Sequence, residues 1–243
     1  MNKDLIQKRF AKNLDTYNDN AKIQKRMAER LLSFLDKKEF SSILEIGCGT
    51  GFLTSLLNKD FKFEKYTAND IVPDCEKYIK EINPNIDFIA DDIELAVKNS
   101  DKKYDLIISN AAFQWVENLE SFINLLVSKL NKGGILLFST FGPENFREVN
   151  FVLGKTLPYY SVNELDEMLK NYDKKIEQEM HVMAFQTPKD ILKHIKSTGV
   201  NALEMVSWTK SDMQKFENGY NNFCSKFPTL TYHPIYVLLK HTN

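Results

Sequence analysis

The stretch that most constrains this chain runs from Ile43 to Gly51 and reads Ile-Leu-Glu-Ile-Gly-Cys-Gly-Thr-Gly. An apolar run that breaks abruptly into glycines is typical of a buried parallel strand that enters a tight loop before a helix. Glycine at positions Gly47, Gly49 and Gly51 permits a positive φ and leaves no Cβ between the backbone and a ligand. The stretch therefore predicts an α/β fold with a binding site at this loop.

The spacing of the three glycines distinguishes between cofactors. Dinucleotides are bound by G-x-G-x-x-G beneath a pyrophosphate, whereas this loop reads G-x-G-x-G and follows Glu45. A carboxylate at that place suits an ammonium group and repels a pyrophosphate. S-adenosylmethionine (SAM) carries an ammonium, a sulfonium, a ribose and an adenine but no phosphate. We therefore predict SAM as the cofactor and S-adenosylhomocysteine as the product, and disfavour a nicotinamide oxidoreductase.

Polar residues at the ends of later strands complete the predicted cofactor site. In doubly wound folds the acid that holds the ribose follows the second strand, about 20 residues past the first glycine, which indicates Asp70. Asp91 and Asp92 compete for the adenine amino group, and we favour Asp92, next to Ile93. Asn110 ends the fourth strand. Because the carboxyl ends of parallel strands meet at one edge, these side chains are expected to converge there.

Apolar runs alternate with helical stretches along most of the chain. This alternation predicts a doubly wound, mostly parallel, seven-stranded Rossmann-like sheet. The predicted strands are the run before Gly47 and the segments Lys65–Asn69, Ile86–Ala90, Tyr104–Asn110, Gly134–Thr140, Lys175–Phe185 and Ile235–Lys240.

Helical segments flank this sheet in the sequence. Residues 1–38 are predicted as an N-terminal helical cap, and Thr187-Pro188 marks a helix start because Thr suits the N-cap and Pro the first turn. The helical insertion opened there extends to about residue 227 and lies between the last two strands, where it is expected to form a lid over the binding site. We predict a single domain over residues 1–243.

Composition narrows the function classes. At 243 residues and 43% hydrophobic the chain can bury one large core, and its formal net charge of −1 gives no sign of nucleic acid or a membrane surface as partner. No apolar run is as long as a membrane span. The three cysteines, Cys48, Cys75 and Cys224, are widely spaced and form no metal motif. We expect a cytoplasmic protein with free thiols and no metal.

The motifs also carry a family resemblance. Over residues 40–140 the glycine loop, Asp70 and the stretch from Asp92 to Glu94 resemble the class I SAM-dependent methyltransferases. Other segments resemble one branch, the malonyl-acyl-carrier-protein O-methyltransferases of biotin synthesis. These segments are Arg9-Phe10 with Tyr17, Ser109–Trp115, Ser139–Phe146, Thr187–Val200 and Leu230–Tyr236. The segment from Asn110 to Trp115 is shared with trans-aconitate methyltransferases, so it does not decide between the two branches.

This resemblance implies methylation of the free carboxylate of malonyl-acyl carrier protein, with malonyl-CoA as a poorer mimic. A carboxylate has a pKa of about 4 and is already ionised at neutral pH, so no catalytic general base is expected. The chemistry then requires carboxylate oxygen, methyl carbon and sulfur in line. The alternatives left open are a small free acid such as trans-aconitate as substrate, and a SAM-binding protein without catalysis.

Four residues are candidates for contacts outside the glycine loop. Arg147 is the candidate for the substrate carboxylate because guanidinium binds carboxylates bidentately; the alternative is a solvated helix residue. Tyr17 would aim the same carboxylate through a neutral hydrogen bond, or else serve as a packing aromatic. Trp115 is a candidate pocket wall or a core residue. Gln24 is a candidate for the cofactor's carboxylate or an exposed helix residue.

Charged and titratable residues elsewhere give weaker signals. Lys189, Lys193 and Lys196 have the spacing of one helix face, which suits docking of an acidic carrier protein but is also common on solvated helices. The four histidines share no spacing and are expected to be structural or exposed. They are His181, His194, His233 and His241.

Overall fold

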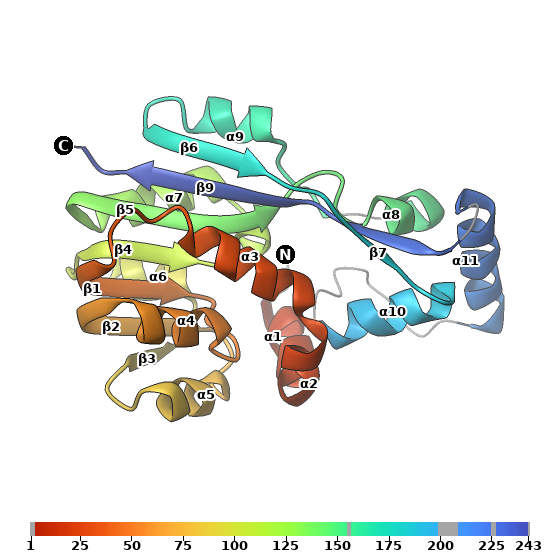
Figure 1. The fold of residues 1–243 in the computed structure, drawn as a ribbon, viewed down its shortest axis with the longest axis horizontal. Helices are drawn as coiled ribbons and strands as arrows, with labels where there is room; N and C mark the ends of the chain where they lie inside the picture. Colours follow the sequence, from red (N-terminus) through yellow and green to blue (C-terminus); the bar gives the residue numbers. More distant parts are fainter. Residues whose placement is uncertain (1–2, 155–156, 199–208, 225–226, 243) are drawn as a thin grey trace.

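The computed structural model describes residues 3–154, 157–198, 209–224 and 227–242. In this part of the chain seven strands form one sheet in the order β3-β2-β1-β4-β5-β9-β6 (Figure 1). The strands are β1 (Glu39–Ile46), β2 (Lys62–Asp70), β3 (Asp87–Ala90), β4 (Tyr104–Ser109), β5 (Leu130–Phe141), β6 (Asp173–Gln178) and β9 (Pro234–Lys240).

The sheet is mostly parallel. Strands β3, β2, β1, β4 and β5 pair in parallel, and β9 runs antiparallel to both β5 and β6. The order reverses at β1, whose neighbours are β2 and β4, and ligands in such folds bind beyond the strand ends at this reversal. The predicted doubly wound, mostly parallel fold is confirmed.

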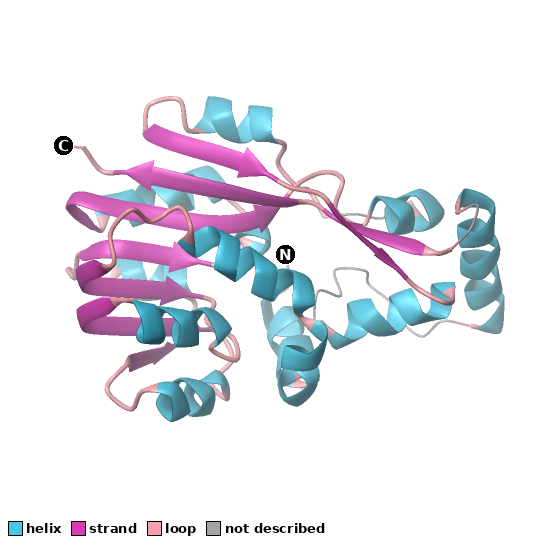
Figure 2. Ribbon diagram, viewed as in Figure 1, coloured by secondary structure: helices cyan, strands magenta, loops and turns pink. Residues whose placement is uncertain are grey.

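Helices cover both faces of the sheet (Figure 2). Because side chains alternate along a strand, neighbouring residues enter different cores: Ile43 packs with helices α3, α4 and α5, whereas Leu44 packs with α6, α7 and α9. The helices are α1 (Lys3–Ala11), α2 (Leu14–Asn20), α3 (Lys22–Leu32), α4 (Phe52–Asp60), α5 (Cys75–Ile82), α6 (Ile93–Lys98), α7 (Leu119–Ser128), α8 (Arg147–Leu153), α9 (Val162–Met168), α10 (Pro188–Ser197) and α11 (Lys210–Phe223).

The N-terminal residues form three short helices at the carboxyl edge of the sheet (Figure 1). Helix α3 buries Ile23, Met27 and Leu31, which recur every four residues and so form one apolar face. On its outer side, the guanidinium of Arg30 pairs with the carboxylates of Glu177 and Glu179 near the end of β6. These contacts hold α3 across the sheet, with its first turn next to the end of β4.

A two-stranded sheet extends beyond the main one and corrects one sequence prediction. The segment Lys175–Phe185 was predicted as one strand, but β6 ends at Gln178 and a separate strand β7 (His181–Ala184) pairs with β8 (Thr229–Tyr232). The prediction of a single strand is wrong because the chain leaves the main sheet after Gln178. Helices α8, α10 and α11 accompany this extension (Figure 1).

The helix predicted after Thr187 begins at Pro188. The hydroxyl of Thr187 accepts a hydrogen bond from the backbone N–H of Asp190, and the carboxylate of Asp190 accepts one from the backbone N–H of Thr187. Residues 199–208 and 225–226 of the predicted insertion, with Gly199 and Val200 of the family segment, lie outside the described residues. The single domain with a cap at about 1–38 and an insertion at about 187–227 stays a prediction. No described helix combines the length and apolar character needed to cross a membrane.

Candidate active site

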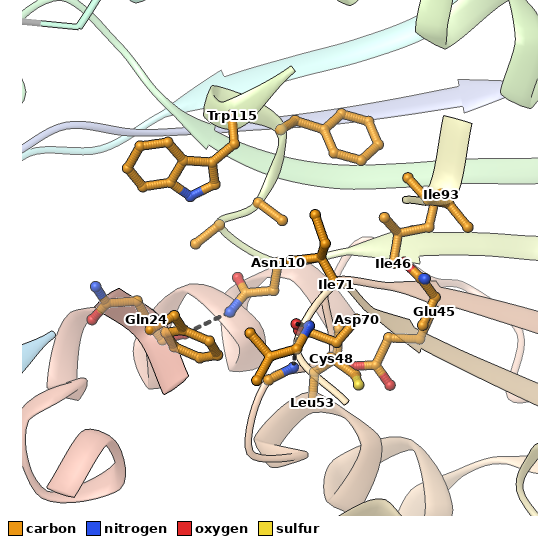
Figure 3. A pocket seen from close by; sticks show the side chains of 18 of the residues that line it. Gln24, Glu45, Ile46, Cys48, Leu53, Asp70, Ile71, Ile93, Asn110 and Trp115 are labelled. Carbon is orange, nitrogen blue, oxygen red and sulfur yellow. Dashed lines mark hydrogen bonds between the residues drawn. The ribbon is translucent and has the colours of Figure 1, made fainter. Parts of the chain in front are cut away.

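The cavity that gathers the predicted residues lies at the carboxyl edge of the sheet, beside β1, β2 and β4 (Figure 3). Its walls come from helices α1 to α3, the loop between β1 and α4, the turn between β3 and α6, and the segment after β4. The predicted residues that line it are Tyr17, Gln24, Glu45, Gly47, Gly49, Asp70, Asp92, Ile93, Asn110 and Trp115.

Two glycines bring bare backbone to this cavity. Gly47 and Gly49 have φ of +68° and +55°, in the left-handed region that favours glycine. A Cβ on Gly47 would lie 2.6 Å from the Cβ of Ala112, and one on Gly49 would lie 3.2 Å from the Cζ of Phe10. The loop therefore forms a cradle whose space a side chain would fill.

Gly51, the third glycine of the loop, lies where helix α4 begins. Gly51 is the N-cap of α4 and has a φ of +78°. It is not among the residues that line the cavity. A Cβ there would lie 2.5 Å from the Cδ1 of Ile82 and 3.2 Å from the Cδ1 of Ile79. Gly51 therefore allows close packing of α4 against α5, and its predicted cofactor contact stays a prediction.

Asp70 ends β2 and is held rigidly at the cavity. Its Oδ2 accepts a 2.9 Å hydrogen bond from the backbone N–H of Gly49, and its Oδ1 accepts one of 2.9 Å from that of Val72. Burial raises the pKa of this carboxyl group, while the two backbone N–H groups oppose the rise. A buried acceptor fixed in this way is preorganised for hydroxyl donors such as those of a ribose.

Glu45 is buried at the end of β1. Its Oε2 accepts a 2.7 Å hydrogen bond from the hydroxyl of Thr54 and another from the phenol of Tyr66. Burial raises the pKa of Glu45 to about 7, against the opposing effect of these two donors, and the nearby carboxylate of Asp70 adds to the rise. A cationic ligand in the cavity would favour the ionised form.

The turn between β3 and α6 places Asp92 and Ile93 on the wall. Asp92 is the N-cap of α6, and its Oδ1 accepts a 3.0 Å hydrogen bond from the backbone N–H of Glu94. The side-chain amide of Asn69 donates to the carbonyl oxygens of Ile89 and Asp91 at 3.0 Å and 2.8 Å and so fixes the turn. Both Asp91 and Asp92 line the cavity.

Asn110 lines the cavity, but its side chain connects elements of the protein. Its Nδ2 donates a 2.9 Å hydrogen bond to the carbonyl oxygen of Gln24 (Figure 3), and its Oδ1 accepts one of 2.7 Å from the hydroxyl of Ser139. That same hydroxyl accepts a 2.9 Å bond from the backbone N–H of Ala111, which has a φ of +53°. Asn110 thereby joins β4, β5 and the first turn of α3.

The side chain of Gln24 has unmet hydrogen-bonding capacity. The residue is 4% exposed, and neither Nε2 nor Oε1 has a partner in the described structure. A buried amide without partners is costly, so these atoms are available for hydrogen bonds to a bound polar group or to water. Because Gln24 lines the same cavity as the glycine cradle, the site fits a ligand that carries polar groups.

Aromatic residues form further parts of the cavity wall. Tyr17 of α2 packs edge-to-face on Phe10, with ring centroids 5.1 Å apart. Burial, together with the negative charge of Asp70, raises the pKa of the Tyr17 phenol, so it stays protonated and able to donate. Trp115 follows β4 in a short 3₁₀ helix, Phe113–Trp115, and forms the far wall (Figure 3).

The structure does not bring Arg147 to the cavity. The chain turns sharply at Phe146, whose φ is +58°, and Arg147 then begins α8. Its guanidinium lies 3.5 Å from the carboxylate of Glu144 and 4.0 Å from that of Glu148, and its side chain is 49% exposed. This turn was not predicted because the residue with positive φ, Phe146, is not glycine.

Further lining residues were not singled out from the sequence. They come from the N-terminal helices, the loops and the start of the insertion, and they include Asn18, Lys25, Thr50, Gln114, Phe141 and Thr198. The hydroxyl of Thr50 donates a 2.7 Å hydrogen bond to Asn18, which ties the glycine loop to α2. The Oε1 of Gln114 is buried without a partner. Gln114 could have been found from the sequence, because it lies within the segment Asn110–Trp115 that carries the family resemblance.

The histidines lie outside the cavity. The Nε2 of His194 lies 2.7 Å from the phenol oxygen of Tyr232, and the ring of His233 contacts the side chain of Gln178 and the backbone N–H of Glu144. These contacts connect the two-stranded extension to its surroundings and agree with the structural role expected for them.

Sequence comparisons identify the family. A family model described as a methyltransferase domain matches residues 20–202. The chain is 40% identical to the malonyl-acyl-carrier-protein O-methyltransferase of Calditerrivibrio nitroreducens over 95% of this chain and 94% of that protein. It is 34% identical to the enzyme of the same name from Chlorobium luteolum, over 98% of this chain and 95% of that protein.

Solved structures agree at the level of the fold. The N-methyltransferase NodS of Bradyrhizobium japonicum, in complex with S-adenosylhomocysteine, has a TM-score of 0.56 at 15% identity and covers 98% of this chain and 99% of its own. The plantazolicin methyltransferase BpumL, also bound to S-adenosylhomocysteine, has a TM-score of 0.54 at 13% identity. It covers 97% of this chain and 91% of its own. Together with the cavity, these matches show that the chain is a SAM-dependent methyltransferase and belongs to the malonyl-acyl-carrier-protein O-methyltransferase family.

Proposed function

We propose that this enzyme transfers the methyl group of SAM to the free carboxylate of malonyl-acyl carrier protein, with malonyl-CoA as a poorer substrate. The observation that carries the proposal is the 40% identity to a protein named for that reaction, over nearly the full length of both chains. The product is a malonyl methyl ester. The same proposal assigns the enzyme to the start of biotin synthesis in the cytoplasm.

The cofactor contacts follow from the site. Gly47 and Gly49 supply the cradle that a side chain would fill, and Asp70 supplies the fixed acceptor for the ribose hydroxyls. For the other predicted residues we propose the following roles: Glu45 for the ammonium group, Asp92 or Asp91 with Ile93 for the adenine, Gln24 for the carboxylate, and Asn110 as the support of Gln24. The buried, unpartnered amide of Gln24 supports this assignment independently of the family match.

The chemistry needs positioning more than proton transfer. Bound SAM supplies a methyl group on a sulfonium, which is a good leaving group. The acceptor carboxylate is already ionised at neutral pH, since its pKa is about 4, and needs no base. The protein's contribution is then to hold the acceptor in line and to exclude water.

Tyr17 and Trp115 are the proposed contacts on the acceptor side. The phenol of Tyr17 stays protonated and provides a neutral donor, which orients a carboxylate without neutralising it. Trp115 provides a flat apolar wall of the same cavity. A neutral donor is suitable here because a strong ion pair would reduce the nucleophilicity of the acceptor oxygen.

Arg147 stays a proposed substrate contact. Because it lies outside the cavity and pairs with Glu144, it can bind the substrate only if it leaves this partner. Its partner Glu144 is 53% exposed, and such surface ion pairs contribute about 0–1 kcal/mol, so the guanidinium can exchange this partner for a substrate carboxylate. The test is Arg147→Ala beside Arg147→Lys. We expect Arg147→Ala to lose methyl transfer and to keep SAM affinity, with partial recovery in Arg147→Lys. Normal activity of Arg147→Ala would remove Arg147 from the site.

The carrier protein is proposed to dock at helix α10. Lys189, Lys193 and Lys196 are exposed on this helix, and Lys193 pairs with Asp190 at 3.2 Å. Carrier proteins are acidic, so an exposed basic face suits their approach. The helix leads to Thr198, which lines the cavity, so a carrier docked there lies close to the site.

The experiment that tests this function is transfer of labelled methyl from SAM to a panel of acceptors. Malonyl-acyl carrier protein, malonyl-CoA and trans-aconitate are compared at equal concentration. Base-labile label on the malonyl carrier supports the proposal. Label on trans-aconitate alone would replace the substrate, and no label on any acceptor while SAM binds would favour a protein without catalysis.

A further inference from the structure

The charge of the cavity walls is uneven. Carboxylates line it at several places: Glu45, Asp70, Asp91, Asp92 and Glu94. Among the described residues that line it, Lys25 is the only lysine or arginine. Such a cavity suits the sulfonium and ammonium groups of SAM but repels a carboxylate everywhere except near Lys25. SAM itself carries a carboxylate, and the proposed acceptor carries another.

Lys25 is positioned to serve such a group. It follows Gln24 in the first turn and a half of α3, and its Nζ lies over the ring of Phe52, 5.2 Å from the centroid. Phe52 is the first residue of α4, directly after the glycine loop. In the described structure the ammonium group of Lys25 has no carboxylate within ion-pair distance. The cation is therefore available beside the cradle.

The start of α3 adds to this positive region. The N-cap residue Ala21 provides no side-chain acceptor for the N–H groups of the first turn. The N-terminus of an 11-residue helix also carries partial positive charge. The hydrogen bond from Asn110 to the carbonyl oxygen of Gln24 fixes this turn against the end of β4. Two independent features thus meet there: an uncapped helix start and a buried amide without partners.

We propose that Lys25, the amide of Gln24 and the first turn of α3 form a carboxylate-binding subsite. Its position beside the glycine loop assigns it to the α-carboxylate of SAM. The carboxylate of the acceptor is the other source of the same chemistry, and only that source depends on the function proposed above. Lys25 then fixes one end of the cofactor and so sets where the methyl group lies.

The test compares SAM with decarboxylated SAM, which keeps the ammonium and sulfonium groups and lacks the carboxylate. Calorimetry gives the affinity of both for the wild type, for Lys25→Met and for Arg26→Met. Arg26 is exposed on the same helix, beyond its first turn, and lies outside the cavity, so its variant matches the charge change. Melting temperatures establish that each variant is folded.

We expect the wild type and Arg26→Met to prefer SAM over decarboxylated SAM by about 10- to 100-fold, the range for a charge-assisted contact. Lys25→Met is expected to lose most of this preference. If the preference survives in Lys25→Met while KM for the malonyl carrier rises, the subsite holds the acceptor carboxylate. If neither changes, the subsite is refuted. The binding measurement needs no methyl transfer, so it stays valid if the proposed acceptor is wrong.

Discussion

The carboxylate of Asp70 accepts a hydrogen bond of 2.9 Å from the backbone N–H of Gly49 and thereby joins the end of β2 to the glycine loop. Its other oxygen accepts one from Val72 at 2.9 Å. The loop and the acid that was predicted to hold the ribose are therefore one rigid unit, in which each fixes the other.

This unit predicts the effect of Asp70→Asn. The variant keeps the size of the side chain but replaces one acceptor oxygen by a donor, which opposes a backbone N–H. We expect SAM affinity to fall by about 10- to 100-fold, as for the loss of a charged hydrogen-bond acceptor. Calorimetry measures it, with exposed Asp74→Asn as control. Equal affinities in the two variants would contradict the role of Asp70.

Alanine variants of two glycines with similar φ distinguish the effect of backbone strain from the effect of a steric clash. Gly47 and Gly133 have φ of +68° and +73°, but only at Gly47 would a Cβ meet another atom within 4 Å. Gly133→Ala is expected to lower the free energy of unfolding by about 1–2 kcal/mol through strain alone. Gly47→Ala adds a clash with Ala112 and is expected to cost about 2–5 kcal/mol and to abolish SAM binding. Urea unfolding and calorimetry measure these effects, and normal SAM binding by Gly47→Ala would contradict the cradle.

The raised pKa of Glu45 predicts a pH dependence of stability. Burial raises it from 4.5 to about 7, so the folded state holds the proton more tightly than the unfolded state does. Its contribution to stability is therefore greatest below pH 4.5 and is lost as the pH rises to about 7. Glu45→Gln removes this titration.

Urea unfolding across that pH interval checks the prediction for Glu45. The stability of the wild type relative to Glu45→Gln is expected to decrease by up to about 3 kcal/mol from the acid to the neutral end. Glu64→Gln, at an exposed position of β2, serves as the control and should not change the slope. A relative stability of Glu45→Gln that does not vary with pH would show that Glu45 titrates normally.

The buried carboxylate of Glu148 lies outside the cavity, and its loss is expected to affect stability alone. Glu148 of α8 is 1% exposed and accepts hydrogen bonds from the backbone N–H of Thr231 at 2.9 Å and from its hydroxyl at 2.6 Å. Glu148→Ala leaves both donors buried without a partner and is expected to cost about 2–4 kcal/mol. Exposed Glu144→Ala is expected to stay within about 0.5 kcal/mol of the wild type. Similar urea midpoints for both variants would contradict this account.

Local sequence signals predicted the parallel half of the molecule. The apolar run before Gly47 and the acid at Asp70 specify a strand, a tight loop and a strand end, and all three depend on residues close in sequence. Asp92 and Asn110 were placed at the same edge because parallel strands share one. The structure adds that the side-chain amide of Asn110 donates a hydrogen bond to the carbonyl oxygen of Gln24. This contact joins distant segments, so no local sequence pattern predicts it.

The features that the sequence did not reveal depend on long-range pairing or on unusual backbone. The segment Lys175–Phe185 alternates like one strand, but its two halves pair with β9 and β8 in different sheets. The paired residues lie 45 to 63 positions further along the chain. Arg147 was chosen for its guanidinium and its place just beyond β5, and the left-handed turn at Phe146, which brings it near Glu144 and Glu148, was not predicted. Lys25 was missed because the carboxylates that line the same cavity come from distant parts of the sequence, and only the fold brings them together with this lysine.

The central claim is that the acceptor is a free carboxylate on a carrier-bound malonyl group. The most direct test is mass spectrometry of malonyl-acyl carrier protein and acetyl-acyl carrier protein, each incubated with the enzyme and SAM. The account predicts that the malonyl carrier becomes one methyl group heavier, that mild base reverses the gain, and that the acetyl carrier stays unchanged. Methylation of the acetyl carrier, or a gain on the malonyl carrier that survives base, would contradict it.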